Sequence, residues 1–191
     1  MIFFVQKNNL NSKVWKNMVN YEKAKEILKK YVKDPKVILH SEGVSNFSMK
    51  LSAKIKQNCP ELKIDKEKIR IAALLHDIGK EYQEGHEERS QNILEKEGLG
   101  EIAKISIHGL SYFRKMERND SRNSTEEIEN KIVVYSDLRF KFSPVAIKER
   151  LEEGKRWWKG TPEEINKRAK HIWHFMLKLE KEIFELTGEE I

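Results

Sequence analysis

The sequence predicts an all-α protein that folds as one helical bundle, and three observations carry this prediction. Apolar residues recur at steps of three and four along most of the chain, the period of a helix that buries one face. Charged residues make up 36% of the sequence and hydrophobic residues 38%, a balance typical of a soluble domain. The 191 residues suffice for one ordinary core and contain no internal repeat. We therefore expect a mostly helical protein with a single core.

Charge and cysteine content narrow the functional classes. The formal charge is +6 and the pI about 9.2, which favours anionic partners such as nucleotides or nucleic acid without choosing among them. Cys59 is the only cysteine, so a disulfide framework and a thiolate metal cage are both excluded. No stretch is long and apolar enough for a signal peptide or a membrane span. We expect a cytoplasmic protein that does not associate with membranes.

The first part of the chain places a histidine on an apolar helix face. Asp34–Pro35 separates two helical patterns, because the residue before proline avoids the α region, and Cys59–Pro60 ends the second. His40 points the same way as the apolar residues of that second helix, where a satisfied core histidine is the commoner explanation. The expected elements are an N-terminal arm at 1–18 and helices over about 21–31 and 37–58.

The third helix carries the most informative stretch, which reads Ile-Ala-Ala-Leu-Leu-His-Asp-Ile-Gly-Lys at residues 71–80. Asp65 is its expected N-cap, and Gly79 is expected to end it in the left-handed conformation. His76 and Asp77 then lie in the last turn of an apolar helix, where inward-facing polar groups are costly unless they are paired. A divalent metal ion would satisfy both groups. A hydrogen-bonded core histidine beside a polar helix end is an equal alternative.

Further candidate ligands follow in the next segments. His86 opens one helix, and His108 ends another that begins at Gly100. Residues 114–127 are polar and have no apolar face, so we expect a long exposed loop that acts as a mobile flap.

The last third of the chain is also predicted to be helical. Asp137 lies in an apolar and aromatic run over residues 128–142, which we interpret as a buried helix because its neighbours are helices. Ser143–Pro144 is expected to cap and begin a helix that reaches about residue 153. Thr161 heads a capping box that begins a long last helix.

The polar residues of these segments lie at the core-facing positions or ends of five successive helices. A helical bundle directs side chains from facing helices into one interior site. Nitrogen and oxygen ligands without sulfur suit Fe, Mn, Ni, Co or Zn, and six of them exceed what one zinc ion needs. The sequence therefore indicates a centre for one or two divalent transition-metal ions. The expected ligands are His40, His76, Asp77, His86, His108 and Asp137.

The order His…His-Asp…His…His…Asp, with His-Asp-Ile-Gly-Lys at its centre, resembles the HD superfamily of metal-dependent phosphohydrolases, of the HDIG type. The resemblance covers about residues 37–142, and the helices at 143–188 resemble the C-terminal elements of such proteins. It implies a helical domain, here at 19–191, with a central metal site that hydrolyses phosphoesters, usually of nucleotides. The family's four common ligands match His40, His76, Asp77 and Asp137, and the additional histidines of its two-metal members match His86 and His108.

The positions of individual residues suggest their roles. The catalytic candidates are Asp77 as the carboxylate between two ions, Lys80 as a phosphate ligand, and Arg139 as a group that binds phosphate or orients a ligand carboxylate. A lysine that only complements the dipole at the helix end is a nearly equal alternative for Lys80. The expected substrate is a small phosphorylated molecule, such as a nucleotide, cleaved at a phosphoester or phosphoanhydride bond.

Two alternatives stay open beside the hydrolase. One is a di-iron oxygenase of the HD type, which uses the same ligands. The other is a non-catalytic module that binds nucleotides or nucleic acid, motivated by Trp157–Trp158 among cationic residues. Nucleic acid is not the favoured partner, because the ligand set is complete. The aromatic-rich last helix leaves pairing into an oligomer open.

Overall fold

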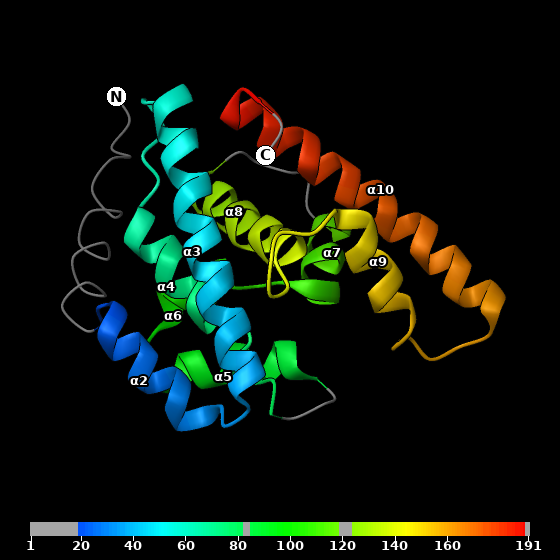
Figure 1. Ribbon diagram of the computed structural model, residues 1–191, viewed down its shortest axis with the longest axis horizontal. Coiled ribbons are helices and arrows are strands. Elements are labelled where there is room, and N and C mark those ends of the chain that lie inside the picture. Colours follow the sequence, from blue (N-terminus) through cyan, green and yellow to red (C-terminus); the bar gives the residue numbers. More distant parts are fainter. Residues whose placement is uncertain (1–18, 82–84, 119–123, 190–191) are drawn as a thin grey trace, which may run out of the picture.

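The computed structural model describes residues 19–81, 85–118 and 124–189, and over these residues it contains α-helices and no strand (Figure 1). The expectation of an all-α fold is thereby confirmed. The expected arm at 1–18 lies outside the described residues. The helices are α2 (Tyr21–Tyr31), α3 (Pro35–Asn58), α4 (Lys66–Leu75), α5 (His86–Lys96), α6 (Gly100–Ile105), α7 (Gly109–Arg118), α8 (Thr125–Arg139), α9 (Ile147–Lys155) and α10 (Pro162–Thr187).

Helix α8 lies at the centre of the bundle. Every residue from Ile128 to Leu138 is buried, and the helix contacts α3, α4, α6, α9 and α10. The interpretation of this apolar run as a buried helix is therefore confirmed. Buried polar groups need partners, and those on α8 have them: Glu129 pairs with Lys68 at 3.2 Å, and Lys131 with Glu182 at 2.9 Å.

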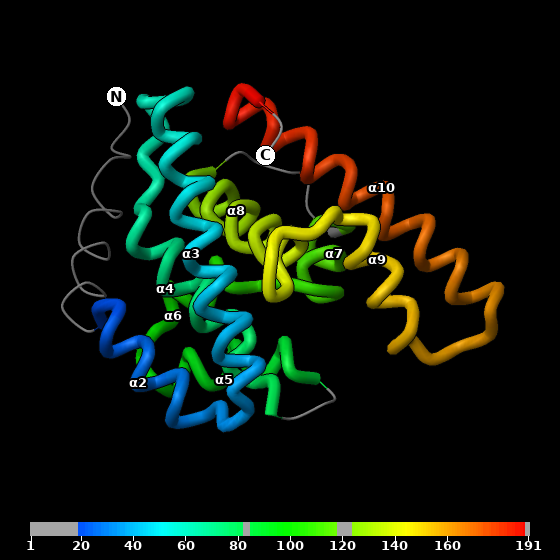
Figure 2. Tube along the Cα trace, viewed as in Figure 1, coloured from blue at the N-terminus to red at the C-terminus, as the bar shows by residue number. Residues whose placement is uncertain are grey.

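Helices α3 and α4 pack closely against each other, and both also contact α8 (Figure 2). Their shared core consists of aliphatic side chains such as Leu51, Ile69 and Ile132, all of which are fully buried. The long helix α10 lies across α3 and α8, and α9 packs beside it. Three chain segments that carry expected ligands therefore meet in one place: α3, the end of α4, and α8.

Several helix ends follow the sequence rules. The Asp65 carboxylate accepts a hydrogen bond from the Lys68 backbone N–H at 3.2 Å, as an N-cap should. Thr161 and Glu164 form the expected capping box at the start of α10. Gly188 closes α10 with φ of 75°, the left-handed conformation that glycine adopts without strain.

The polar stretch at 114–127 is not one long loop, so that expectation is wrong. Helix α7 continues to Arg118, and α8 already begins at Thr125, with Ser124 as its N-cap. Residues such as Arg, Lys, Met and Glu have high helix propensity, and buried Tyr112 and Phe113 anchor α7 to the core. The remaining part of the expected flap, 119–123, lies outside the described residues.

Ser143–Pro144 does not begin a helix either. Helix α9 starts at Ile147 after an Ala146 N-cap, while Pro144 forms an isolated bridge with Phe140. The chain turns back on itself here, because the Val145 N–H donates to the Arg139 carbonyl at 2.8 Å. This reversal sets α9 against the end of α8, which matters for the site below.

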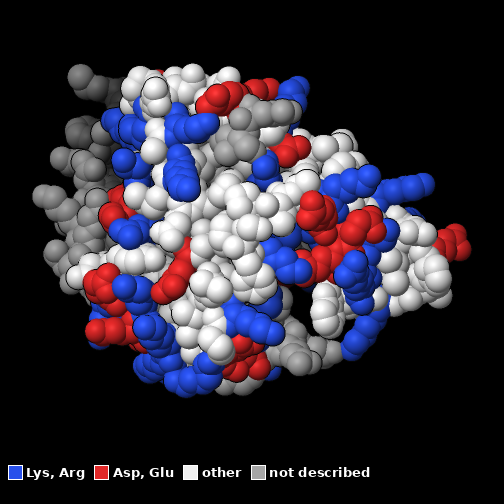
Figure 3. Space-filling view, in the orientation of Figure 1, with Lys and Arg blue, Asp and Glu red and all other residues white. Residues whose placement is uncertain are grey.

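The outer surface mixes charges of both signs. In Figure 3, Lys and Arg lie interspersed with Asp and Glu over the visible face. Among the described residues, no helix combines the length and the apolar character needed to cross a membrane.

Candidate metal centre

Helix α3 brings His40 to the site from one side. Its Nδ1 lies 3.0 Å from the Lys141 carbonyl oxygen, and its Nε2 lies 3.2 Å from Asp137 Oδ1 on α8. Only 13% of the side chain is exposed. A carbonyl oxygen can only accept a hydrogen bond, so Nδ1 carries the proton and Nε2 faces the site.

The turn after α4 supplies His76 and Asp77, both buried. His76 Nδ1 donates to the Ala73 carbonyl oxygen at 2.7 Å, so its Nε2 also points inward. We expected a left-handed conformation at Gly79, and this expectation is wrong, because Gly79 does not have a positive φ angle. Glycine is required there by space: a Cβ would lie 2.6 Å from the His86 carbonyl oxygen and 2.7 Å from the Ser90 nitrogen.

The first turn of α5 is tied to its surroundings at three points. Ser90 Oγ accepts a hydrogen bond from the Gly79 N–H at 3.0 Å, which holds α5 against the turn after α4. Glu87 accepts from the backbone N–H groups of Leu110 and Ser111 at 2.9 and 2.7 Å and so caps the start of α7. These contacts place His86, whose Nε2 lies 3.6 Å from an Asp77 oxygen.

His108 lies in the short connection between α6 and α7, since α6 ends at Ile105 rather than at His108 as expected. Its Nδ1 donates to the Ser106 carbonyl oxygen at 3.1 Å. The buried amide of Asn130 on α8 donates to the carbonyl groups of Ile105 and Ile107, each at 2.8 Å, and thereby holds this connection in place. His108 Nε2 lies 3.2 Å from Asp77 Oδ1.

The structure thus brings all six expected ligands together around Asp77. The two oxygens of this carboxylate face different imidazoles. Oδ2 lies 3.6 Å from His76 Nε2 and 3.9 Å from His40 Nε2. Oδ1 lies 3.2 Å from His108 Nε2 and 3.6 Å from His86 Nε2. Among the residues that the structure describes, two triplets have ligand atoms within 4.8 Å of one another, and His76 belongs to both: His40, His76 and Asp137, and His76, Asp77 and His108.

The donor set fits a divalent metal ion. Three imidazoles have Nδ1 bound to a backbone carbonyl, which orients the ring and leaves the Nε2 lone pair free for a metal. His76 Nε2 and His108 Nε2 are buried without a hydrogen-bond partner. Buried nitrogen atoms in that state are costly unless an ion or a water molecule satisfies them. Facing lone pairs of imidazole and carboxylate, gathered in one place, are what a cation would hold together.

The electrostatics of the two carboxylates favour their ionised forms. Burial raises the pKa of Asp77, but the imidazole of His76 and the ammonium group of Lys80 outweigh it and hold the pKa well below its usual range. Burial likewise raises the pKa of Asp137, but the guanidinium of Arg150 and the imidazoles of His40 and His76 together outweigh it, so the net pKa is well below normal. Both groups are therefore carboxylates at neutral pH, as metal ligands must be.

The imidazoles behave differently from one another. Burial lowers the pKa of His40, but the Asp137 carboxylate outweighs it and the net pKa is raised. For His108, burial lowers the pKa and the Asp77 carboxylate raises it, and the net pKa is raised. Burial, together with a neighbouring lysine, lowers the pKa of His86 to about 4. His86 is therefore neutral at physiological pH, whereas the neighbouring carboxylates favour the protonated forms of His40 and His108, and a metal ion would compete with those protons.

The two cationic residues expected at the site, Lys80 and Arg139, differ in their position relative to the His/Asp cluster. Lys80 Nζ lies 3.3 Å from both Asp77 and His86 Nε2, and 42% of its side chain is exposed, so it borders the cluster on the solvent side. Arg139 does not join the cluster. Its guanidinium donates to the Tyr135 hydroxyl at 2.7 Å and to the Val145 carbonyl at 2.9 Å. Residues two apart on a helix face different directions, which explains why Arg139 turns away although Asp137 does not.

Sequence reasoning missed Arg150. This residue lies on α9, and its Nη2 is 3.1 Å from Asp137 Oδ1. No signal in the sequence pointed to it, because the contact depends on how the chain reverses after α8. Sequence reasoning also did not identify the roles of Glu87 and Asn130. For Asn130 the sequence offered one indication, because it is a polar residue inside the apolar run of α8.

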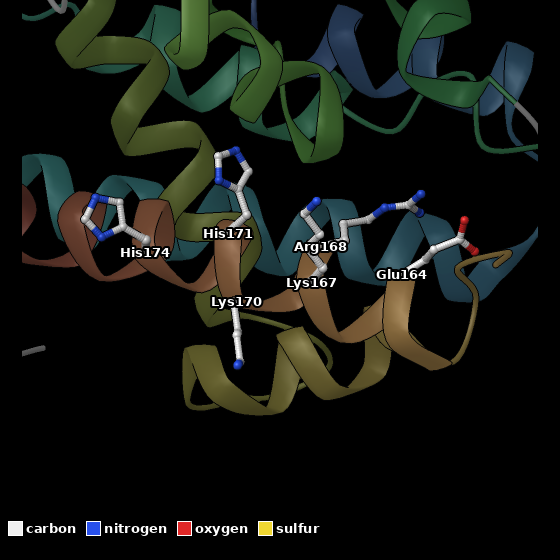
Figure 4. Close-up of a pocket in the computed structure, with 6 residues that line it drawn as sticks. All are labelled: Glu164, Lys167, Arg168, Lys170, His171 and His174. Carbon is white, nitrogen blue, oxygen red and sulfur yellow. The ribbon is translucent and has the colours of Figure 1, made fainter. Parts of the chain in front are cut away.

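A surface hollow of about 750 Å³ lies elsewhere, and Figure 4 shows its lining. All of its lining residues come from α10, and none belongs to the His/Asp cluster. One of them, His171, pairs with Glu117 of α7. The hollow is thus separate from the candidate centre. It is lined by Glu164, Lys167, Arg168, Lys170, His171 and His174.

Comparison with known proteins agrees with this geometry. The fold and the cluster define a class: a helical bundle with a buried interior His/Asp group compatible with a metal site. Residues 37–139, more than half of the chain, match the HD domain family, and the chain belongs to that family. HD domains bind divalent metal ions, and most members of the family are metal-dependent hydrolases. No curated protein and no solved structure matches the chain significantly.

Proposed function

We propose that the protein is a metal-dependent phosphohydrolase that cleaves a phosphomonoester, phosphodiester or phosphoanhydride bond of a small, nucleotide-like substrate. The observation that carries this proposal is the Asp77 carboxylate, whose two oxygens face separate pairs of imidazoles. That arrangement supports two ions with Asp77 between them, bound by the six residues of the cluster. Membership of the HD domain family supports the same chemistry.

In this proposal, different residues of the chain bind the metal and the substrate. His40, His76, His86 and His108 would supply Nε2 ligands, and Asp77 and Asp137 carboxylate ligands, to the metal. When bound, a divalent ion lowers the pKa of water from about 15.7 towards about 7 and polarises a phosphoryl oxygen. Lys80, half-exposed beside Asp77, would hold a further phosphate oxygen of an arriving substrate. The backbone carbonyls on Nδ1 keep the imidazoles from rotating out of place.

The same ligands also suit a di-iron oxygenase. The ammonium group of Lys80 at the solvent side of the cluster favours a hydrolase, since it complements a phosphate and has no evident part in oxygen activation. A panel of phosphoesters, together with polyols and phosphonates, separates the two when it is tested with the metal-loaded protein: hydrolysis products of a phosphoester support the hydrolase, and oxygen consumption with a polyol or phosphonate supports the oxygenase. A protein that binds metal but does neither would be a binding module.

The proposal is tested directly with His76→Ala and Asp77→Asn. Asp77→Asn keeps the shape of the side chain and removes the charge, so it isolates the role of the carboxylate. We expect both variants to keep the helical circular dichroism signal and to lose both bound metal and hydrolysis of the phosphoester substrate. Lys50→Ala, an exposed change on α3, is the control. Undiminished hydrolysis in either site variant would refute the assignment.

A further inference from the structure

Asp137, one of the expected ligands, also contacts a cation from outside the matched family region. The family match ends at residue 139, whereas Arg150 lies beyond it on α9. Its Nη2 is 3.1 Å from Asp137 Oδ1, the same oxygen that lies 3.2 Å from His40 Nε2 and 3.6 Å from His76 Nε2. One carboxylate oxygen is therefore shared by two imidazoles and a guanidinium.

Arg150 is itself held from the other side. Its Nη1 lies 2.8 Å from Glu153 Oε2, and the other oxygen of Glu153 lies 2.7 Å from Lys141 Nζ. The Lys141 carbonyl in turn accepts the hydrogen bond from His40 Nδ1. The contacts form a closed circuit of five side chains and one backbone carbonyl, running from His40 through Asp137, Arg150, Glu153 and Lys141 back to His40.

The segment that carries the circuit is fixed against α3. Gly43 lies one turn after His40, and a Cβ on it would be 1.9 Å from the Phe140 ring, so the ring packs directly on the helix backbone. The Val145 N–H donates to the Arg139 carbonyl oxygen at 2.8 Å, and Arg139 Nε donates to the Val145 carbonyl oxygen at 2.9 Å. These two hydrogen bonds fix the other end of the chain reversal. These contacts hold the segment that leads into α9, so Arg150 lies on a rigid part of the chain, as a residue that positions a ligand requires.

Stability alone is a poor explanation for this ion pair. The side chains of Arg150 and Asp137 are 20% and 10% exposed, and partly buried ion pairs often contribute little net stability after the cost of desolvation. A guanidinium does have a planar fork that can hold two carboxylates in fixed directions at once. Here that fork spans Asp137 and Glu153.

We propose that Arg150 is a positioning residue of the metal centre, which holds the Asp137 carboxylate in the orientation that presents it to the metal together with His40 and His76. The inference rests on the proposed function in so far as the cluster binds a divalent ion. It extends the centre to the segment 140–153, beyond the matched family region. Arg150 acts through Asp137 and does not itself bind the metal.

The test measures the affinity for Co²⁺, with metal-free protein and visible absorption as the readout. Arg150→Gln removes the charge and the fork but keeps a long polar side chain. Arg156→Gln is the matched control, an exposed arginine that follows α9. Loss of a residue that orients a metal ligand typically costs about 10–100-fold in metal affinity, and we expect a loss in that range for Arg150→Gln with an altered Co²⁺ spectrum. Arg150→Lys, which restores the charge without the fork, should recover part of the affinity.

An Arg150→Gln protein that is folded and binds Co²⁺ as tightly as wild type, with an unchanged spectrum, would overturn the inference. If Arg150→Gln does not fold, Arg150→Lys decides the question: a loss of Co²⁺ affinity relative to wild type supports the inference, and an unchanged affinity overturns it. Wild-type protein that binds Co²⁺ but hydrolyses no phosphoester would refute the proposed function and leave the affinity comparison intact. Wild-type protein that binds no metal would refute both.

Discussion

Asp77 Oδ1 lies 3.2 Å from His108 Nε2, although the whole of α5 and α6 separates these residues in the chain. The contact forms because Asn130 on the central helix holds the connection that carries His108. It places His108 on the opposite carboxylate oxygen from the one that faces His40. The two halves of the cluster are thus built by different parts of the fold and share Asp77 and His76.

This division predicts how metal content changes on mutation. His76 belongs to both ligand triplets and His108 to only one. If wild type binds two ions, as the proposed function expects, His108→Ala should retain about one ion per chain and His76→Ala should retain none. Elemental analysis of protein purified without chelators or an affinity tag measures this. An equal loss of metal in both variants would contradict a centre with two separable halves.

The response of stability to pH should reverse on loading with metal. In the metal-free protein, the raised pKa values of His40 and His108 mean that the folded state holds protons that the unfolded state releases above about pH 6.5. Stability then falls as pH rises through the raised values. Metal displaces these protons, so in the loaded protein it is the unfolded state that takes up protons as pH falls. We expect Tm to fall between about pH 6 and pH 8 without metal and to rise or stay level with it.

Thermal unfolding at the two pH values, with and without Co²⁺, checks this reversal. His171→Asn is a control, because this exposed histidine lies outside the cluster. A metal-free protein whose Tm rises over the same interval would show that His40 and His108 are not protonated in the folded state.

Gly79→Ala should disturb both stability and His86. The added Cβ would meet backbone atoms of His86 and Ser90 at 2.6 and 2.7 Å, which can give way only if α5 shifts. Overpacking of this kind costs about 1–3 kcal/mol, and the shift would move His86 away from Asp77. Urea unfolding measures the first effect, and the metal content the second. Gly100→Ala is the control, since its Cβ would meet only the flexible end of Glu95 at 3.3 Å.

Lys80→Ala should weaken substrate binding more than it weakens metal binding. Lys80 Nζ borders the cluster with 42% of its side chain exposed, so its contribution is partly screened by solvent. We expect kcat/KM to fall about tenfold, which corresponds to about 1.4 kcal/mol, with most of the change in KM. Steady-state kinetics on the best phosphoester gives the split, and metal content gives the control. An unchanged KM would mean that Lys80 serves only the fold.

Local rules on the sequence already determined much of this protein. Helical periodicity located α3 and α4, the helical neighbours of the apolar run at 128–142 indicated α8, and the caps at Asp65 and Thr161 lie where the sequence predicted them. The six polar residues of the cluster were recognised because each interrupts an apolar face or ends a helix, and polar groups there need partners. Such signals extend over a few residues, so they can be read without knowing the fold.

Only the tertiary structure decided the rest, because those features depend on contacts between distant segments. Gly79 is required by the close approach of α5 rather than by its own backbone conformation. Arg139 turns towards Tyr135 and Val145, whereas Arg150 reaches Asp137, since the chain reverses after α8. Periodicity specifies which face of a helix is buried, but the partner of each buried group is set by how the helices pack against one another.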